Sequence, residues 1–220
     1  FKEYLEQPQK DALTFEERLG IMVDREWTER QERRLKYRLG RSKIRETACV
    51  EDIDYRHPRG LDRSVMQRLN TCQWAKRHEN IILTGKTGLG KTWISCALAH
   101  KACREGYTIL YVRVPRMLQD IYVAHADGTY PKVMAKLAKP DVLILDDFGL
   151  APLGDLERRD LLEVIEDRQN RRSTIITSQL KVKHWHEIIG DPTIADAIMD
   201  RLVSSSHRIE MNGKSMRKKK

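Results

Sequence analysis

Short runs of apolar residues alternate along the chain with segments in which apolar residues recur every three or four positions. The short runs cover residues 81–84, 108–114, 142–145, 174–179 and 207–211, and runs of this length are typical of strands buried on both faces of a sheet. The intervening segments have the period of amphipathic helices. Because strands and helices alternate, the pattern predicts an α/β fold with a five-stranded parallel sheet and helices on both of its faces.

Turn residues and apolar faces bound the expected helices. Asp127-Gly128 interrupts the long stretch between the second and third strands, so we expect two short helices there, the second at residues 131–138. A turn-rich connection at residues 51–61 precedes the first strand. The other expected helices cover residues 62–78, the segment that contains Ile94, Ala97 and Leu98 and ends near Gly106, residues 156–167 and residues 192–203.

The first 50 residues show helical periodicity and no strand pattern. Thr14-x-x-Glu17 fits a capping box at the start of an apolar face, whose members are Phe15, Leu19, Met22, Val23 and Trp27. Gly20 weakens a continuous helix and Thr28-x-x-Gln31 offers a second start, so one long helix and two shorter ones both remain open. We therefore expect a small all-helical N-terminal domain at residues 1–50, for assembly and DNA contact, before a second domain at residues 51–220.

The formal net charge of +9 is concentrated in two basic segments. Residues 30–45 carry eight basic side chains against one acidic one, and the last eight residues add five basic ones. Such concentrations favour a polyanionic partner such as nucleic acid, bound through its phosphates rather than by base reading, although solvated charged faces remain the alternative. The candidate DNA-binding residues are arginines of the first basic segment and lysines along one face of a later helix: Arg33, Arg34, Arg38, Arg41, Lys132, Lys136 and Lys139.

The sequence disfavours a membrane-spanning protein and a secreted protein held together by disulfides. No run approaches the roughly 18 apolar residues of a membrane span, and no signal peptide is visible. The four cysteines show no C-x-x-C spacing, which is typical of free thiols in a reducing compartment. We therefore expect a cytoplasmic protein with no membrane contact. Because the chain begins at Phe1, we also expect that some residues precede it.

The first strand runs directly into a glycine-rich segment, Gly85-Lys86-Thr87-Gly88-Leu89-Gly90-Lys91-Thr92. This segment matches the P-loop pattern, in which glycines let backbone N–H groups surround phosphate oxygens at a helix N-terminus. We expect Lys91 to contact the β- and γ-phosphates and Thr92 to bind Mg²⁺. Trp93 completes the expected cofactor-binding segment, and the predicted cofactors are ATP and Mg²⁺.

The third strand ends in two carboxylates, Asp146 and Asp147. In a Walker B strand the first acid holds Mg²⁺ and the second orients the attacking water, so both are candidate site residues. Asp147-Phe148-Gly149 also spells a kinase motif, but the catalytic loop and strand lysine that accompany it in kinases are missing from the sequence. The Asn-Lys-x-Asp motif of switch GTPases is missing too. The sequence therefore favours an ATPase.

Longer motifs extend over nearly the whole chain: Glu16-Glu-Arg-Leu-Gly20, Asp24-Arg-Glu-Trp27, Glu51-Asp-Ile-Asp-Tyr55, Pro58-Arg-Gly-Leu-Asp62, Asp146-Asp-Phe-Gly-Leu-Ala-Pro152, Arg172-Ser-Thr-Ile-Ile-Thr-Ser-Gln179, His184-Trp-His-Glu187, Gly190-Asp-Pro192 and Asp196-Ala-Ile-Met-Asp-Arg-Leu202. They resemble the IstB transposition ATPases. The resemblance implies a three-layer AAA+ core of the initiator and helicase-loader clade, related to DnaC and DnaA, without a full C-terminal lid. It also implies a homo-oligomer, in a ring or spiral, that uses ATP to assemble on DNA and deform it, and that presents a target site to an IstA-type transposase. The transposase then stimulates ATP hydrolysis and disassembly.

The resemblance also implies roles for residues outside the two nucleotide motifs. Gln179 matches the sensor-1 residue that helps to hold the γ-phosphate and the attacking water. Arg201 matches the arginine finger, which reaches the ATP of a neighbouring subunit. Arg217 resembles a sensor-2 arginine, although the family has Glu where Lys214 stands.

Two other functions remain open. A replicative helicase loader shares the ATPase core, but the Glu16–Gly20 and Asp24–Trp27 motifs favour the transposition helper. A nucleotide-gated DNA scaffold with little turnover is the second alternative, because Asp147 is one methylene shorter than the usual AAA+ glutamate.

Overall fold

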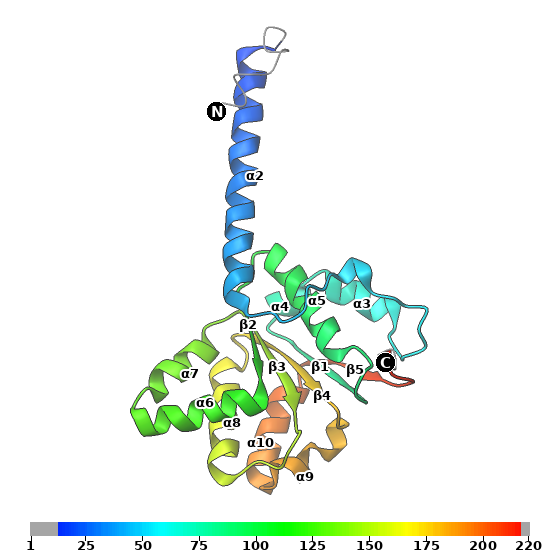
Figure 1. Cartoon of the computed structure of the whole chain (residues 1–220), viewed down its shortest axis with the longest axis vertical. Helices are drawn as coiled ribbons and strands as arrows, with labels where there is room; N and C mark the ends of the chain where they lie inside the picture. The colour runs from blue at the N-terminus through cyan, green and yellow to red at the C-terminus, as the bar shows by residue number, and fades with distance from the viewer. Residues whose placement is uncertain (1–12, 217–220) are drawn as a thin grey trace. The chain divides into compact units, whose positions relative to one another are not determined.

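A five-stranded parallel sheet forms the centre of the molecule, with its strands in the order β2-β3-β4-β1-β5 (Figure 1). The structure is a computed structural model that describes residues 13–216. The strands are β1 (Asn80–Gly85), β2 (Ile109–Arg113), β3 (Val142–Phe148), β4 (Ser173–Ser178) and β5 (Ser206–Met211). The predicted sheet is confirmed, and each predicted strand is found within a few residues of its expected bounds.

Helices cover both faces of the sheet. One face carries α5 (Lys91–Arg104), with α3 (Arg63–Asn70) and α4 (Gln73–Lys76) beside it (Figure 1). The opposite face carries α6 (Val114–Asp127), α7 (Tyr130–Ala138), α8 (Asp155–Arg168), α9 (Trp185–Ile189) and α10 (Pro192–Val203). Short 3-10 turns lie at Val50–Asp52 and Val182–His184. The central strands are buried on both faces, which explains why their sequences are continuously apolar rather than alternating.

The helix expected at residues 62–78 is interrupted, so that prediction of one continuous helix was wrong. Cys72 adopts a left-handed conformation with φ 55°, which ends α3 before α4 begins. The Thr71 hydroxyl donates to the Arg68 carbonyl at 2.7 Å and so satisfies a group that the next helical turn would have used. The two helices expected on either side of Asp127-Gly128 are confirmed as α6 and α7.

The N-terminal segment is one long helix, α2 (Phe15–Ser42). The predicted capping box is present, because the Thr14 amide donates to Glu17 Oε2 at 2.8 Å and the Glu17 amide donates to Thr14 Oγ1 at 3.3 Å. Thr28 does not start a second helix, since its hydroxyl donates back to the Asp24 carbonyl within the same helix at 2.8 Å. The chain divides into two units, one that ends at Tyr37 and one that begins at Arg38. Among residues 13–216, none of the helices has the length and apolar character needed to cross a membrane.

Candidate nucleotide-binding site

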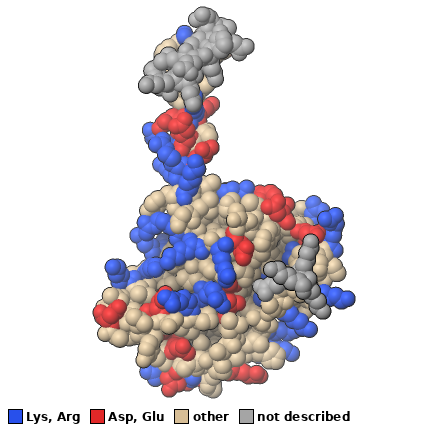
Figure 2. Space-filling model, in the orientation of Figure 1, with Lys and Arg blue, Asp and Glu red and all other residues tan. Residues whose placement is uncertain are grey.

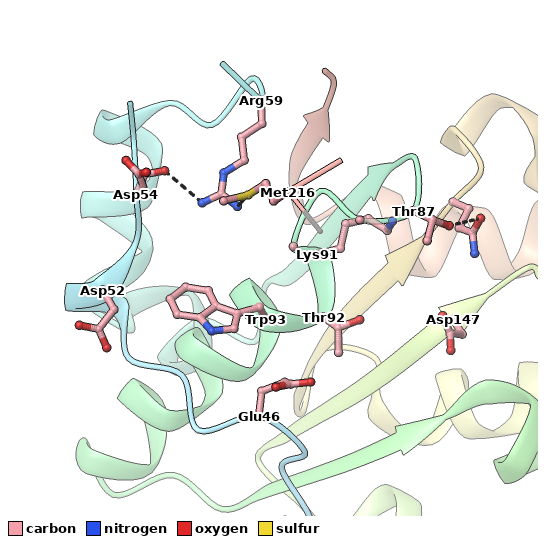
Figure 3. A pocket seen from close by; sticks show the side chains of 13 residues that line it. Glu46, Asp52, Asp54, Arg59, Thr87, Lys91, Thr92, Trp93, Asp147 and Met216 are labelled. Atoms are coloured by element: carbon pink, nitrogen blue, oxygen red, sulfur yellow. Dashed lines mark hydrogen bonds between the residues drawn. The ribbon is translucent and has the colours of Figure 1, made fainter. Parts of the chain in front are cut away.

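The predicted P-loop connects the end of β1 to the start of α5, at the carboxyl edge of the sheet. It borders a pocket of about 390 Å³, a volume within the range of small-molecule sites. Figure 3 shows Thr87 and Asp147 toward one end of this pocket and Asp52 and Trp93 toward the other. The lining residues are Glu46, Asp52, Asp54, Arg59, Thr87, Gly88, Gly90, Lys91, Thr92, Trp93, Asp147, Gln179 and Met216.

The glycines of the loop are required by its backbone and by its neighbours. Gly85, Gly88 and Gly90 have φ values of 144°, 86° and 88°, which L-residues rarely adopt. A Cβ atom on Gly85 would lie 2.2 Å from the Met211 carbonyl oxygen, and one on Gly88 would lie 2.1 Å from Ser215 Oγ. The spacing of glycines therefore reflects both conformation and close packing.

The lysine and the sensor-1 candidate both contact the loop. Lys91 Nζ donates to the carbonyl oxygens of Gly85 at 2.6 Å and Lys86 at 3.0 Å, which holds its ammonium group over the centre of the loop. Gln179 follows the end of β4, and its Oε1 accepts from Thr87 Oγ1 at 2.8 Å. The structure thus brings Gln179, 92 positions away in sequence, against the P-loop.

Asp146 lies at the centre of a hydroxyl network. Its Oδ1 accepts from Thr92 Oγ1 at 2.9 Å and from Thr177 Oγ1 at 2.5 Å, and its Oδ2 accepts from the Tyr111 hydroxyl at 2.6 Å. Burial and this hydrogen bond raise the pKa of Tyr111, so the phenol stays protonated and donates. The two residues predicted to hold Mg²⁺, Thr92 and Asp146, are therefore adjacent, and their hydroxyl and carboxylate oxygens are the ligands that this ion prefers.

Asp147 occupies a β-bulge, which sequence periodicity does not reveal. The register between β3 and β4 shifts between Leu145 and Phe148, and Asp147 has φ 61°. In a regular strand the two acids would point to opposite faces, and the bulge re-aims the second one. Arg113 on β2 holds that carboxylate through Nε and Nη2, both at 2.8 Å from Oδ2, and this hydrogen bond raises the pKa of Arg113.

The arginine-finger candidate, Arg201, lies at the amino-terminal end of β1, whereas the P-loop follows the carboxyl-terminal end of this strand. Asn80, the first residue of β1, donates from Nδ2 to the carbonyl oxygens of Arg201 at 3.3 Å and Leu202 at 3.2 Å. The length of β1, about 17 Å at the usual rise, separates that point from the P-loop. The Arg201 guanidinium pairs with Glu166 at 2.7 Å, so Arg201 is not part of the nucleotide pocket of its own chain.

The predicted DNA-binding residues differ in their surroundings. Arg38 Nε donates to the Cys103 carbonyl at 3.0 Å, close to the C-terminus of α5, a structural contact that favours a cation there. Arg33 pairs with Glu26 at 3.6 Å within α2. The remaining candidates Arg34, Arg41, Lys132, Lys136 and Lys139 are exposed. Arg217, the sensor-2 candidate, lies outside the described residues.

A second hollow lies along β2, the edge strand of the sheet, between that strand and the helices α6 and α7. It has a volume of about 380 Å³, and Lys43, Arg113, Arg116 and Lys136 contribute basic side chains to its lining. Figure 2 shows Lys and Arg gathered over this part of the molecule. We call this hollow the basic groove. Lys136 is the member of the predicted lysine face that lines it, whereas Lys43, Arg113 and Arg116 come from other segments of the chain that the fold brings together.

Sequence reasoning missed Arg59, Tyr111, Arg113 and Thr177. Each lies outside the P-loop and Walker B motifs, and each reaches the site through an interaction that spans 30 or more positions. For Arg113 and Thr177 the only signal was a polar residue at the carboxyl end of a predicted strand. Arg59 stood in a turn-rich connection that offered no such signal.

The structure resembles several solved proteins in its fold. It superposes on DnaI with a TM-score of 0.65 and 20% sequence identity, covering 76% of this chain and 92% of that one. It superposes on the DnaC helicase loader with a TM-score of 0.60 and 18% identity, covering 75% of this chain and 97% of that one. A DnaA structure with bound AMPPCP and single-stranded DNA gives a TM-score of 0.61 at 14% identity, covering 78% of this chain and 52% of that one.

The sheet order, the P-loop and the Walker B acids define the class of the protein, a P-loop ATP-binding protein with an AAA+ fold. Within this class, the chain belongs to the family of IstB-like ATP binding proteins, whose sequence pattern matches residues 1–220. An insertion sequence ATP-binding protein of Sinorhizobium fredii is 48% identical over 99% of this chain and 89% of its own length. The IS21 ATP-binding protein of Pseudomonas aeruginosa is 31% identical over 98% of this chain and 81% of its own. The resemblance seen in the motifs is thereby confirmed.

We predict that Lys91→Ala removes most ATP affinity, because it deletes the fixed positive charge that faces the β- and γ-phosphates. Lys76→Ala is the control, since Lys76 is an exposed lysine at the end of α4 that does not line the pocket. Isothermal titration calorimetry should give an ATP affinity reduced by at least about 10-fold for the first variant, the effect of one charge-assisted hydrogen bond, and near wild type for the second. Equal losses in both variants would contradict the assigned role of Lys91.

Proposed function

We propose that this protein is an ATP-dependent DNA-binding regulator of transposition. It assembles as a homo-oligomer on double-stranded target DNA, remodels that DNA and delivers it to a transposase of the same insertion sequence, and ATP hydrolysis drives its release. The observation that carries the proposal is a complete P-loop and Walker B site in a chain that belongs to the insertion-sequence family. The N-terminal 50 residues serve in assembly and DNA contact.

The residues around the pocket divide the work of hydrolysis. Thr92 and Asp146 would hold Mg²⁺, which neutralises charge on the phosphates when it is bound. Lys91 binds the β- and γ-phosphates, and Gln179 and Asp147 orient the attacking water. Arg201 acts on the ATP of the next subunit, and Trp93 lies at the opposite end of the pocket from Asp147 (Figure 3).

The ion pair with Arg113 restrains the Asp147 carboxylate through Oδ2, and release of that pair would free this oxygen to accept a hydrogen bond from water. We therefore predict that Arg113→Gln raises basal ATP hydrolysis by about 2- to 10-fold, the equivalent of one partly exposed charged hydrogen bond. Arg116→Gln is the control, because Arg116 lines the same basic groove and pairs with Asp120 instead. A steady-state phosphate-release assay measures both. Lower activity in Arg113→Gln than in the control would show that the ion pair supports the active state.

The Arg113–Asp147 pair also motivates a second candidate function, a nucleotide-gated DNA scaffold with little turnover. If the short Asp147 carboxylate stays paired with Arg113, the protein would bind ATP and hydrolyse it slowly. Multiple-turnover ATPase measurements with and without DNA and transposase distinguish the scaffold from the ATPase. A scaffold would release most of its ATP without hydrolysing it, even when both partners are present.

The proposal is tested by DNA binding in the presence of an ATP analogue or ADP, followed by capture of purified transposase or replicative helicase. We expect tight DNA binding with the analogue alone, a steep loss with added salt because counterions are released from several phosphates, and capture of the transposase. Lys136→Gln combined with Arg116→Gln should flatten the salt dependence, by about one unit of slope for each lost phosphate contact. Capture of the helicase in place of the transposase would favour the loader function.

Arg201 provides a test of action between subunits. Because it lies away from its own P-loop, we predict that Arg201→Ala keeps ATP binding and loses hydrolysis, by a factor on the order of 10³ where such fingers have been measured. Mixing it with Lys91→Ala protein pairs an intact P-loop with an intact finger. The mixture should regain activity that neither variant has alone, as measured by phosphate release. If co-assembled variants regain none, Arg201 does not act in trans.

A further inference from the structure

Arg59 is a buried cation at the nucleotide pocket that belongs to none of the recognised nucleotide motifs. It lies in the connection that precedes α3, and only 3% of its surface is exposed. Its side chain reaches the P-loop, where Nη1 donates to the Leu89 carbonyl oxygen at 3.0 Å. In Figure 3 its guanidinium lies along the pocket between Asp54 and Lys91.

The charge of Arg59 is not neutralised by these contacts. Besides the Leu89 carbonyl, its guanidinium donates to the Asp54 carbonyl oxygen at 3.1 Å and to Met216 Sδ at 2.9 Å, and all of these acceptors are uncharged. The carboxylate of Asp54 pairs with Arg56. Arg59 Nε is buried without a hydrogen-bond partner among the described residues. Burial accordingly lowers the pKa of Arg59, since a buried charge without a counter-ion is costly.

The surrounding backbone is built to keep this guanidinium beside the loop. A Cβ atom on Gly90 would lie 2.8 Å from Arg59 Nη1, so glycine at this position leaves the space that the arginine occupies. The Asn212 amide donates to the Arg59 carbonyl oxygen at 3.0 Å, and the Met216 amide donates to the Gly88 carbonyl oxygen at 2.9 Å. The connection, the P-loop and residues 212–216 thus enclose Arg59 together.

We propose that Arg59 binds the phosphate chain of a nucleoside di- or triphosphate, as a second fixed cation beside Lys91. The inference rests on the proposed nucleotide site and adds a ligand-binding residue to it. A buried cation with unused N–H groups, in the lining of a pocket that a phosphate-binding loop also lines, is completed by an anionic ligand. Among residues 13–216 no carboxylate forms an ion pair with Arg59, and bound phosphates would supply the missing negative charge.

The test compares the charge of Arg59 with its hydrogen bonds. Arg59→Lys keeps the charge but loses the fork that links Leu89 and Asp54, whereas Arg59→Gln can donate a hydrogen bond but is neutral. Arg59→Met serves as a second neutral variant. Arg56→Gln is the matched control, because Arg56 lies three positions away with 95% of its side chain exposed. Calorimetry measures ATP and ADP binding, adenosine is tested by competition, and thermal unfolding without nucleotide checks each fold.

We expect Arg59→Gln and Arg59→Met to weaken ATP and ADP by about 10- to 100-fold, the range of one charge-assisted hydrogen bond. Arg59→Lys should recover part of this loss, and adenosine binding should not change. The proposal is overturned if the neutral variants bind ADP like wild type or if Arg59→Lys loses as much ADP affinity as Arg59→Gln. It is also overturned if the affinity for adenosine falls as much as the affinity for ADP. Lys91→Ala is measured in parallel to separate failure of this proposal from failure of the nucleotide site. If Lys91→Ala loses ATP binding while Arg59→Gln keeps it, the nucleotide site stands and the role of Arg59 is rejected.

Discussion

The close packing of the P-loop backbone is the constraint on which the rest of the site depends. The loop must turn its N–H groups inward, which requires positive φ at Gly85, Gly88 and Gly90. The loop is also packed tightly against Met211, Ser215 and Arg59, at distances that leave no room for a Cβ atom on its three glycines. Segments before β1 and after β5 therefore fix the same loop. A substitution in either segment can reach the phosphates without touching the motif.

Charge placement is the second theme of the site. Each acid at the end of β3 already has partners in the free protein: Asp146 accepts three hydroxyl hydrogen bonds, and Asp147 accepts the Arg113 guanidinium. The first arrangement fixes the orientation of the carboxylate that we propose as a Mg²⁺ ligand. The second restrains the Asp147 carboxylate, and it joins the nucleotide pocket to the basic groove that Arg113 also lines. Nucleotide chemistry and the groove thus share one side chain.

Most of the fold could be predicted, because strands buried on both faces are apolar without interruption and the helices between them keep their period. The failures have local causes. The helix expected at residues 62–78 breaks where Cys72 turns left-handed, and no residue there is a glycine or proline that would have marked it. For α2, the choice between one helix and two depended on whether Thr28 capped a new helix or bonded within the existing one.

The sequence by itself determined the nucleotide chemistry, because a P-loop needs its glycines, lysine and threonine within eight consecutive positions, and a Walker B acid needs only a buried strand before it. The tertiary structure decided which distant side chains join them. Gln179 meets Thr87, and Tyr111 and Thr177 hold Asp146, because parallel strands bring their carboxyl ends to one edge of the sheet while the chain between them varies in length. Tertiary packing brings Arg59 from the connection before α3 to Leu89. It also separated Arg201 from its own P-loop by the length of β1. Spacing along a sequence carries no information about either relation, since the sheet order is set by packing rather than by chain order.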